Sequence, residues 1–353
     1  MPLDPSQIEY VINEQHVKQP FSGVIQVREE GEVVFEDAYG YANRADAIPN
    51  VVNTRFGIAS GTKTFTGVAV CQLIEQGKLA LDTRFTDLVT AYEFPQFDPA
   101  ITIRHLLTHS SGAPDYFDEE ELDAQADFGA IFGDLPVYKV SEPKDLLPLF
   151  QNEPMKFAPG ERFSYSNGGY ILLGLAIEAA SGMPYAEYVE QHVFRRAGMS
   201  DSGYFALNNL PARCATGYLD DGRTNIYEIP IKGMPDGGAF VTARDMARFW
   251  DALFEAQLLS LEMAAQLLRP QIEVNPANAD DNRHYGYGVW VIKDEDGVSH
   301  IYSTGSDPGV AFVSTNFMAH KVDLTILGNT ESAAWPVFGA VEELILGGNS
   351  ANS

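Results

Sequence analysis

The chain has 353 residues, of which 45% are hydrophobic and 11% aromatic, so it can bury the core of one large domain or two moderate ones. Its 23 Lys and Arg face 49 Asp and Glu, and the resulting formal charge of -26 would repel nucleic-acid phosphates and anionic membranes. We therefore expect neither nucleic acid nor a membrane as a partner.

The first residues, MPLDPSQIEYVINEQ, have neither a basic start nor an apolar stretch, so no signal peptide is visible. The longest apolar run, which begins at Tyr170, is shorter than the roughly 20 residues of a membrane span. We expect a soluble, cytoplasmic protein, unless an export signal has been trimmed. Cys71 and Cys214 are too few for a disulfide framework, and neither is assigned a redox role.

Two elements are predicted near the start of the chain. Over residues 21–43 apolar and polar residues alternate on both sides of Glu30 and Gly31, which predicts a β-hairpin. From Ser60 to Gly77 apolar residues dominate, which predicts a helix that is buried on most sides and has Gly77 at its C-terminal cap.

The remaining elements follow in two blocks. Between about residue 80 and residue 230, turn signals are dense and helical patterns dominate. Three antiparallel strand segments follow within 285–330, and a last helix is predicted over 334–347.

These patterns predict an α/β fold, with an antiparallel sheet built from both chain ends and flanked by helices. We expect residues 1–80 and 231–353 to form the sheet region and residues 81–230 to form a mostly helical insertion. The active site is expected at the interface of the two regions.

Ser60 and Lys63 stand three residues apart at the start of the first buried helix. Residues at i and i+3 lie on one helical face with Cβ atoms about 5 to 6 Å apart, so the amine can reach the hydroxyl. A first-turn serine also has free backbone N–H groups that can stabilise charge on a substrate oxygen. A neutral lysine could take the hydroxyl proton. The alternative is a helix cap followed by a solvated amine.

A second S-x-x-K, formed by Ser141 and Lys144, serves as an internal control. Because Pro143 and an apolar run follow, Ser141 is predicted to be a helix N-cap with Lys144 in solvent. Spacing alone therefore does not establish catalysis at Ser60, and further motifs are needed.

Tyr165, Ser166 and Asn167 lie in a polar segment directly before an apolar helix. Asn167 by itself is compatible with a simple N-cap. A phenol beside an ammonium can have its pKa lowered and shuttle protons, and an amide oxygen can hold a lysine head group. Ser60, Lys63 and Tyr165 together could acylate and deacylate.

The segment YSTGSDPGVAF contains a third candidate, Ser303-Thr304-Gly305, followed by Ser306. The simple interpretation is a hairpin turn. The functional one is an edge strand beside the serine, with the backbone N–H groups of Ser306 and Ser60 forming an oxyanion hole.

This order of motifs resembles the serine β-lactamase and penicillin-binding-protein superfamily, most of all its class C β-lactamase branch with related esterases and D-peptidases. Phrases such as RHLLTHSSGAPDY extend the resemblance over about residues 20–330. The resemblance implies Ser60 as nucleophile, Lys63 as its base partner, Tyr165 as general acid and base, and Asn167 as organiser of the lysine and the substrate amide. It implies a small ester, amide or peptide substrate and no cofactor.

The third motif departs from the family, which usually has Lys-Thr-Gly or His-Thr-Gly where this chain has Ser303, Thr304 and Gly305. These residues and Ser306 remain candidates for substrate binding. Loss of the cation removes a charge-assisted contact to a substrate carboxylate, which typically contributes about 1.5 to 3 kcal/mol.

Residues 115–134 are acidic and contain no Lys or Arg. A solvated loop is one interpretation. By resemblance the segment lies near the mouth of the site, where its field would disfavour anionic substrates. We therefore expect a neutral or amine-bearing ester or amide substrate and weak or no β-lactamase activity. The acids are Asp115, Asp118, Glu119, Glu120, Glu121, Asp123, Asp127 and Asp134.

Three rival interpretations were weighed. His105 and His109 have zinc-helix spacing, but Leu106 stands where a zincin has glutamate, so no metal site is expected. A Ser-His-Asp hydrolase needs an exposed nucleophile elbow, G-x-S-x-G, and the segment GIASG does not have that spacing. The remaining alternative is a non-catalytic ligand-binding or sensor module on the same fold, which the intact motif residues at 60, 63, 165 and 167 disfavour.

Overall fold

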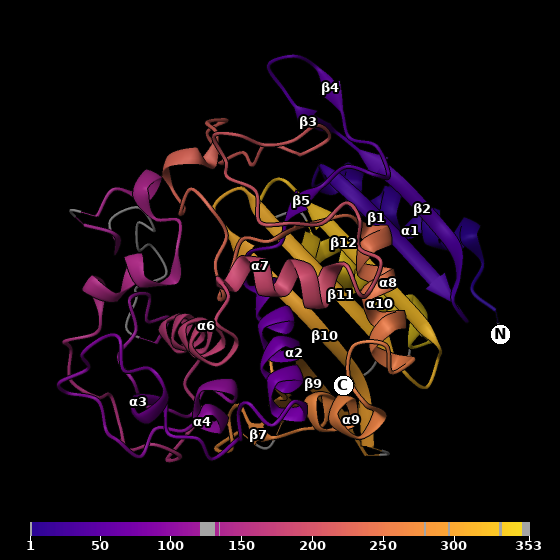
Figure 1. Ribbon diagram of the computed structural model, residues 1–353. Helices are drawn as coiled ribbons and strands as arrows, with labels where there is room; N and C mark the ends of the chain where they lie inside the picture. Colours follow the sequence, from indigo (N-terminus) through magenta and orange to yellow (C-terminus); the bar gives the residue numbers. More distant parts are fainter. Residues whose placement is uncertain are drawn as a thin grey trace.

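An eight-stranded antiparallel sheet forms the centre of this computed structural model, which describes residues 2–120, 131–133, 135–278, 280–295, 297–331 and 334–347 (Figure 1). The strand order is β2-β1-β12-β11-β10-β9-β8-β7. Its strands are β1 (Gly23–Glu29), β2 (Glu32–Tyr39), β7 (Ile272–Glu273), β8 (Arg283–Tyr285), β9 (Trp290–Asp294), β10 (Gly297–Asp307), β11 (Val310–Phe317) and β12 (Val322–Gly328). Two small ribbons pair β3 (Tyr41–Asn43) with β4 (Ile48–Pro49) and β5 (Phe56–Gly57) with β6 (Phe240–Val241).

Helices cover the sheet and extend beyond one side of it (Figure 1). The α-helices are α1 (Pro5–Lys18), α2 (Thr62–Glu75), α3 (Phe85–Leu88), α4 (Ile103–Leu107), α6 (Asn167–Ser181), α7 (Tyr185–Val189), α8 (Ala243–Phe254), α9 (Leu261–Leu268) and α10 (Ala334–Ile345). Short turns of other helical types are η1 (Ala59–Gly61), η2 (Val137–Lys139), η3 (Pro143–Leu149), η4 (Glu190–Phe194) and η5 (Asn225–Tyr227).

The two ends of the chain build the same sheet. The predicted N-terminal hairpin is confirmed: β1 pairs with β2, and Glu30 and Gly31 turn between them at φ 51° and 87°. On its other side β1 pairs with β12, so Gly23 lies opposite Gly328. The predicted α/β class with an antiparallel sheet is confirmed, whereas the division at residues 80 and 230 stays a proposal.

The sheet separates two apolar layers. Ile25 packs with Ile8 of α1 and Val341 of α10 on one face, whereas the neighbouring Val24 joins the larger core on the other face. This alternation is the two-residue period of a strand. Every residue of β11 is buried, which is expected of a strand covered on both faces.

Helix α2 lies between the sheet and the helices α3, α4 and α6 (Figure 1). Its buried residues run from Thr62 to Leu73, as the sequence predicts. The helix ends at Glu75 with Gln76 as its C-cap, and Gly77 follows the cap at φ 69°. The N–H of Gly77 donates to Ile74 O and that of Lys78 donates to Leu73 O, which is a Schellman motif. A helix enclosed on all sides can present a polar group to a buried site, provided that the group is paired.

The control motif differs in detail from its prediction. Ser141 does not cap the following turn, because Glu142 is the N-cap of η3 and forms a capping box with Asp145. The backbone N–H groups of Ser141 and Glu142 both donate to Asp145. Lys144 is exposed, as predicted, and pairs with Glu142.

Both cysteines are free. Burial raises the pKa of the Cys71 thiol, and burial also raises that of Cys214 to about 11. Within the described ranges, no helix has the length and apolar character needed to cross a membrane.

Candidate active site

The segment before α2 holds Ser60 in a fixed position. Strand β5 pairs with β6, and Gly238 N–H donates to the carbonyl of Ala59 at 3.1 Å. Ala59 adopts φ 44°, a left-handed conformation that is uncommon for a residue with a side chain and that clusters at functional sites. The following Ser60 lies in the first turn, where backbone N–H groups have no acceptor within the helix.

Lys63 is 1% exposed, and three oxygens surround its amine. Its Nζ donates to Asn167 Oδ1 and to the carbonyl of Asp236, both at 2.7 Å, and lies 3.0 Å from Ser60 Oγ. The first two oxygens can only accept, so they engage two N–H bonds of the amine. The third position faces a hydroxyl, which can accept from an ammonium or donate to a neutral amine. The geometry therefore fits the lysine before and after proton transfer.

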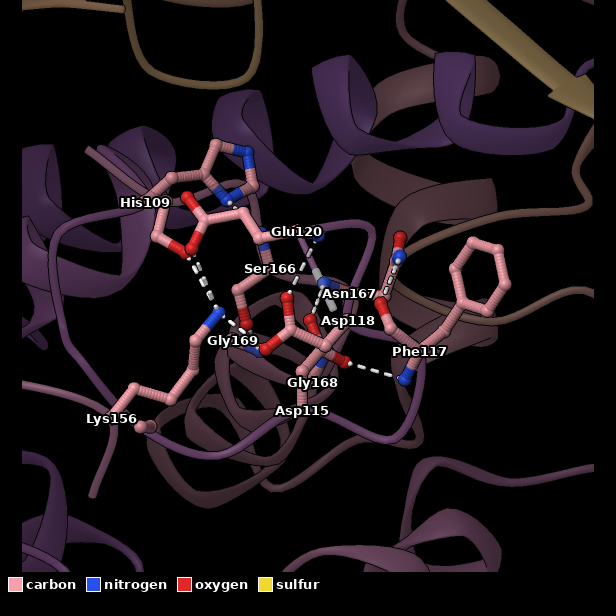
Figure 2. Close-up of polar contacts among 12 residues, drawn as sticks. His109, Asp115, Phe117, Asp118, Glu120, Lys156, Ser166, Asn167, Gly168 and Gly169 are labelled. Carbon is pink, nitrogen blue, oxygen red and sulfur yellow. Dashed lines mark hydrogen bonds and ion pairs between the residues drawn. The ribbon is translucent and has the colours of Figure 1, made fainter. Parts of the chain in front are cut away.

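Asn167 is the first residue of α6 and not its cap. The N-cap is Ser166, whose hydroxyl accepts from Gly169 N at 2.9 Å. The Asp115 carboxylate accepts from the backbone N–H groups of Asn167 and Gly168 at 2.6 and 2.8 Å (Figure 2). Because these groups fix the helix start, the Asn167 amide is free to point at Lys63. Burial raises the pKa of Asp115 to about 6, despite these hydrogen bonds.

Tyr165 is the third side chain at the Ser60 and Lys63 pair. Its hydroxyl lies within interaction range of Ser60, which acts to lower the pKa of the phenol. Lys63 Nζ lies 4.9 Å from the centre of the phenol ring, and that ring stacks on Trp290 at 6.0 Å with an interplanar angle of 14°. The structure thus brings Ser60, Lys63, Tyr165 and Asn167 together from two separate parts of the sequence.

The expected lowering of the tyrosine pKa is wrong for the protein without substrate. Burial, and then the charge of Glu119, raise the pKa of Tyr165 well above its ordinary value, and the interaction with Ser60 opposes this only in part. Tyr165 is therefore a neutral phenol near pH 7, suited to donating a proton.

Strand β10 approaches Ser60 along its free edge. A Cβ on Gly305 would lie 2.6 Å from Ser60 N, so the two backbones are in contact. Asp307 and Val310 close a two-residue hairpin, so the next pair along the ladder, Ser306 and Ala311, is a non-hydrogen-bonded pair, and the Ser306 N–H points away from β11. Beyond Tyr302 β10 has no β9 partner, so this edge faces the serine.

Ser303 and Thr304 do not face the cavity at Ser60. Ser303 is 2% exposed, and its hydroxyl donates to Gly61 O at 3.1 Å and lies 2.8 Å from Thr64 Oγ1. Thr304 donates to Phe312 O across the hairpin. Both hydroxyls are engaged within the protein, which favours a structural role, and their contact with substrate stays a prediction.

Replacing Ser303 with alanine should lower the free energy of unfolding by about 1 to 3 kcal/mol, because Gly61 O and Thr64 lose a buried partner. Chemical denaturation measures this change. A large rise in KM with unaltered stability would instead establish Ser303 as a substrate contact.

A cavity opens in front of Ser60 and is lined also by Asn167 and Ser306. Its charged lining residues are Glu119, Lys232, Asp236 and Asp307.

The carboxyl groups of this cavity are hard to ionise. Burial raises the pKa of Asp236, although Lys63 lowers it, and Tyr116 donates a hydrogen bond to its carboxylate. Burial, followed by the charge of Asp236, raises the pKa of Asp307 to about 7. A bound cation would favour the ionised forms of both groups.

The acidic segment is only partly a solvated loop. Glu119 and Glu120 are exposed, but Asp115 caps α6 and Asp118 pairs with Lys156 (Figure 2). The prediction of an acidic mouth is supported by Glu119, which lines the cavity. The remaining acids lie outside the described residues: Glu121, Asp123, Asp127 and Asp134.

Each of the two histidines with zinc-helix spacing accepts a backbone hydrogen bond through Nδ1. His105 Nδ1 accepts from the N–H of Thr102, and His109 Nδ1 accepts from that of Ser166. His109 is 1% exposed, with its ring centre 4.4 Å from that of Tyr165, and burial lowers its pKa well below the ordinary value. His109 thus packs behind the tyrosine as a neutral ring.

Sequence reasoning missed several residues of the cavity. Asp236 supplies both a carbonyl to Lys63 and a carboxylate, and Tyr116 and Lys232 were not singled out for a role. No motif spacing marks them. The glycines that flank Asp236 were a signal of close backbone approach: Gly233 and Gly238 lie so near each other that a Cβ on either would clash.

Comparison with known proteins places this geometry in context. The Beta-lactamase family profile matches residues 13–337. Penicillin-binding protein 4* of Bacillus subtilis is 29% identical over 334 residues, which cover 89% of this chain and 69% of that protein. Esterase EstB of Burkholderia gladioli is 33% identical over 199 residues, covering 55% of this chain and 49% of the esterase.

A solved structure, the penicillin-binding protein from Bacillus halodurans, is 45% identical and superimposes with a TM-score of 0.87. The match covers 94% of this chain and 99% of that structure.

Proposed function

The chain belongs to the Beta-lactamase family, and from that premise we propose that it is a serine hydrolase that forms an acyl-enzyme on an ester or amide. The observation that carries this proposal is the amine of Lys63, held by two fixed acceptors with its third position 3.0 Å from Ser60 Oγ. A serine and a base within hydrogen-bond reach, with the base oriented by further groups, is the arrangement of an activated nucleophile.

In the proposed acylation, Ser60 Oγ attacks the carbonyl carbon while Lys63, assisted by Tyr165, takes the hydroxyl proton. The backbone N–H groups of Ser60 and Ser306 stabilise the negative oxygen of the tetrahedral intermediate. Tyr165 then protonates the leaving group, a role that suits its neutral phenol. Asn167 holds the lysine through both steps.

In the proposed deacylation, the Tyr165 and Lys63 pair takes a proton from a water molecule that attacks the acyl carbon. The same N–H groups stabilise the second tetrahedral intermediate, and Ser60 leaves as its hydroxyl. The reaction consumes one water and releases the carboxylic acid.

The cavity supports a neutral or amine-bearing substrate. Three carboxyl-bearing residues line it, against one lysine, Lys232. Ser303 provides no cation where the family usually has one. The esterase relative supports ester cleavage, and the relatives named as penicillin-binding proteins support acylation of the serine.

A substrate panel tests this specificity. We expect kcat/KM for short p-nitrophenyl esters or for D-amino-acid amides to exceed that for nitrocefin by roughly one to two decades, because nitrocefin carries a carboxylate. Initial rates at matched concentrations and moderate salt measure the difference. Efficient nitrocefin turnover would overturn the specificity, and absence of turnover on every substrate would overturn the hydrolase.

A further inference from the structure

A second cavity, of about 230 Å³, adjoins the catalytic one. We call it the side chamber; its apolar lining includes Phe56, Phe205, Leu207, Leu210, Ile226, Phe240 and Val310. Both cavities are bordered by Asp307, and also by Ile229, Pro230, Gly233 and Gly238. The shared wall means that a molecule bound at Ser60 can extend into the side chamber.

Asp307 is the charged residue in the lining of the side chamber, and it stands where the two cavities meet. It directly follows Ser306, one of the proposed oxyanion donors. In the described part of the chain, no hydrogen bond or direct ion pair engages its carboxylate. The carboxylate is therefore available to a ligand close to the reacting carbonyl.

The hairpin that carries Asp307 is held firmly. Asn225 donates from Nδ2 to Pro308 O at 2.9 Å. Gly309 has φ 74°, and a Cβ there would lie 2.7 Å from Tyr218 N. Because the turn packs closely on the segment from Gly217 to Asn225, the carboxylate is positioned before a substrate binds, which reduces the ordering cost of binding.

We propose that the substrate is an α-amino ester or amide with an apolar side chain, whose ammonium binds Asp307 and whose side chain enters the side chamber. This inference rests on the proposed hydrolase function and names its substrate class. The ammonium would lie near the scissile carbonyl, because Asp307 lines the same cavity as Ser60 and Ser306. Apart from Asp307, the described lining carries no charged side chain, and its neutral polar residues are two threonines and two asparagines, so an uncharged side chain suits the chamber best.

Six methyl esters test the pairing of amine and apolar group: those of phenylalanine and alanine, each as both enantiomers, and those of 3-phenylpropanoic and propanoic acids, which lack the amine. We expect kcat/KM to favour one enantiomer of phenylalanine over 3-phenylpropanoate by roughly tenfold to a hundredfold. Asp307→Asn should reduce this ratio at least tenfold. Product release is followed by chromatography.

The side chamber has its own variant. Leu210→Trp should lower kcat/KM for phenylalanine methyl ester more than for the alanine ester, because the indole is larger than the leucine side chain and would fill part of the chamber. Glu93→Gln removes an exposed acid and is the charge-matched control, which should leave the amine preference as in the parent. Thermal unfolding of each variant separates misfolding from lost selectivity.

The preference should also depend on pH. Asp307 is faced by Lys63 and by the acids Asp236, Glu331 and Glu119. Since burial and Asp236 raise its pKa to about 7, the carboxyl is largely neutral at pH 5.5 and gains charge as the pH rises. The amine preference of the parent should therefore increase between about pH 5.5 and 6.5, where the α-amine of the ester stays mostly protonated.

The outcomes separate this inference from the function on which it rests. If the protein hydrolyses p-nitrophenyl esters but has the same kcat/KM for phenylalanine methyl ester as for methyl 3-phenylpropanoate, the inference is wrong and the hydrolase function is still supported. An equal fall in kcat/KM for all six methyl esters in Asp307→Asn also overturns it. No turnover of any ester overturns both.

Discussion

Replacing Ser60 with alanine is expected to lower kcat/KM by roughly 10³-fold or more and to prevent covalent labelling. In the described site, Ser60 is the nucleophile that contacts the Lys63 amine. The fold should survive, since Lys63 keeps its contacts with Asn167 and Asp236. We expect the free energy of unfolding to change by about 1 kcal/mol at most. Steady-state rates and the intact mass after reaction with an activated ester measure the two effects.

Ser141→Ala is the matched control for this substitution. Ser141 belongs to the second S-x-x-K, but it is exposed and Lys144 pairs with Glu142. Its loss should leave labelling and turnover as in the parent protein. If the parent protein itself gains no adduct and shows no turnover, while still binding ligands, the non-catalytic binding module is the correct interpretation.

Replacing Gly305 with alanine is expected to lower kcat/KM by about 10²-fold or more. The added Cβ would lie 2.3 Å from Ile58 O and 2.6 Å from Ser60 N, and neither backbone atom can move without displacing the serine. Displacing an oxyanion donor typically costs about 10²- to 10³-fold in kcat. The same strain should lower the free energy of unfolding by about 1 to 3 kcal/mol. Kinetics and chemical denaturation test these two changes separately.

Gly339→Ala is the control for a glycine substitution. Gly339 lies inside α10, where a Cβ would meet nothing within 4 Å. Alanine there should stabilise the protein by up to about 1 kcal/mol, because glycine is the poorer helix former. If Gly305→Ala behaves like Gly339→Ala, β10 does not constrain the serine and the proposed oxyanion hole is wrong.

Local patterns were sufficient for the elements that frame the site. The hairpin over 23–39 follows from two β-prone runs around a Glu-Gly turn, and the burial of α2 follows from the many apolar residues after Phe65. The start of α6 was less certain from sequence, because Ser166 and Asn167 are both good N-cap residues. The contact with Lys63 shows which of them is free for another role.

The electrostatics of the site could not be predicted from residue types. The sequence suggested a phenol with a lowered pKa beside a lysine, whereas burial and Glu119 raise the pKa of Tyr165. In the same way, the sequence predicts that the acids of 115–134 form one charged segment, whereas Asp115 accepts a hydrogen bond from the first residue of α6. The effect of a charge on a pKa depends on its distance from the titrating group and on how far both are buried, and the order of residues specifies neither.

The sequence by itself determined the α/β class, the N-terminal hairpin, the buried helix α2, the late strands and the three motifs that point to acyl transfer, because these depend on periodicity and on spacing within single segments. Only the tertiary structure decided that Asp236 holds Lys63, that Ser303 is buried against Gly61, and that Asp307 stands between two cavities. These features join residues more than 150 positions apart or depend on which side of a strand faces a void. Such contacts arise when whole layers pack, so no local pattern specifies them.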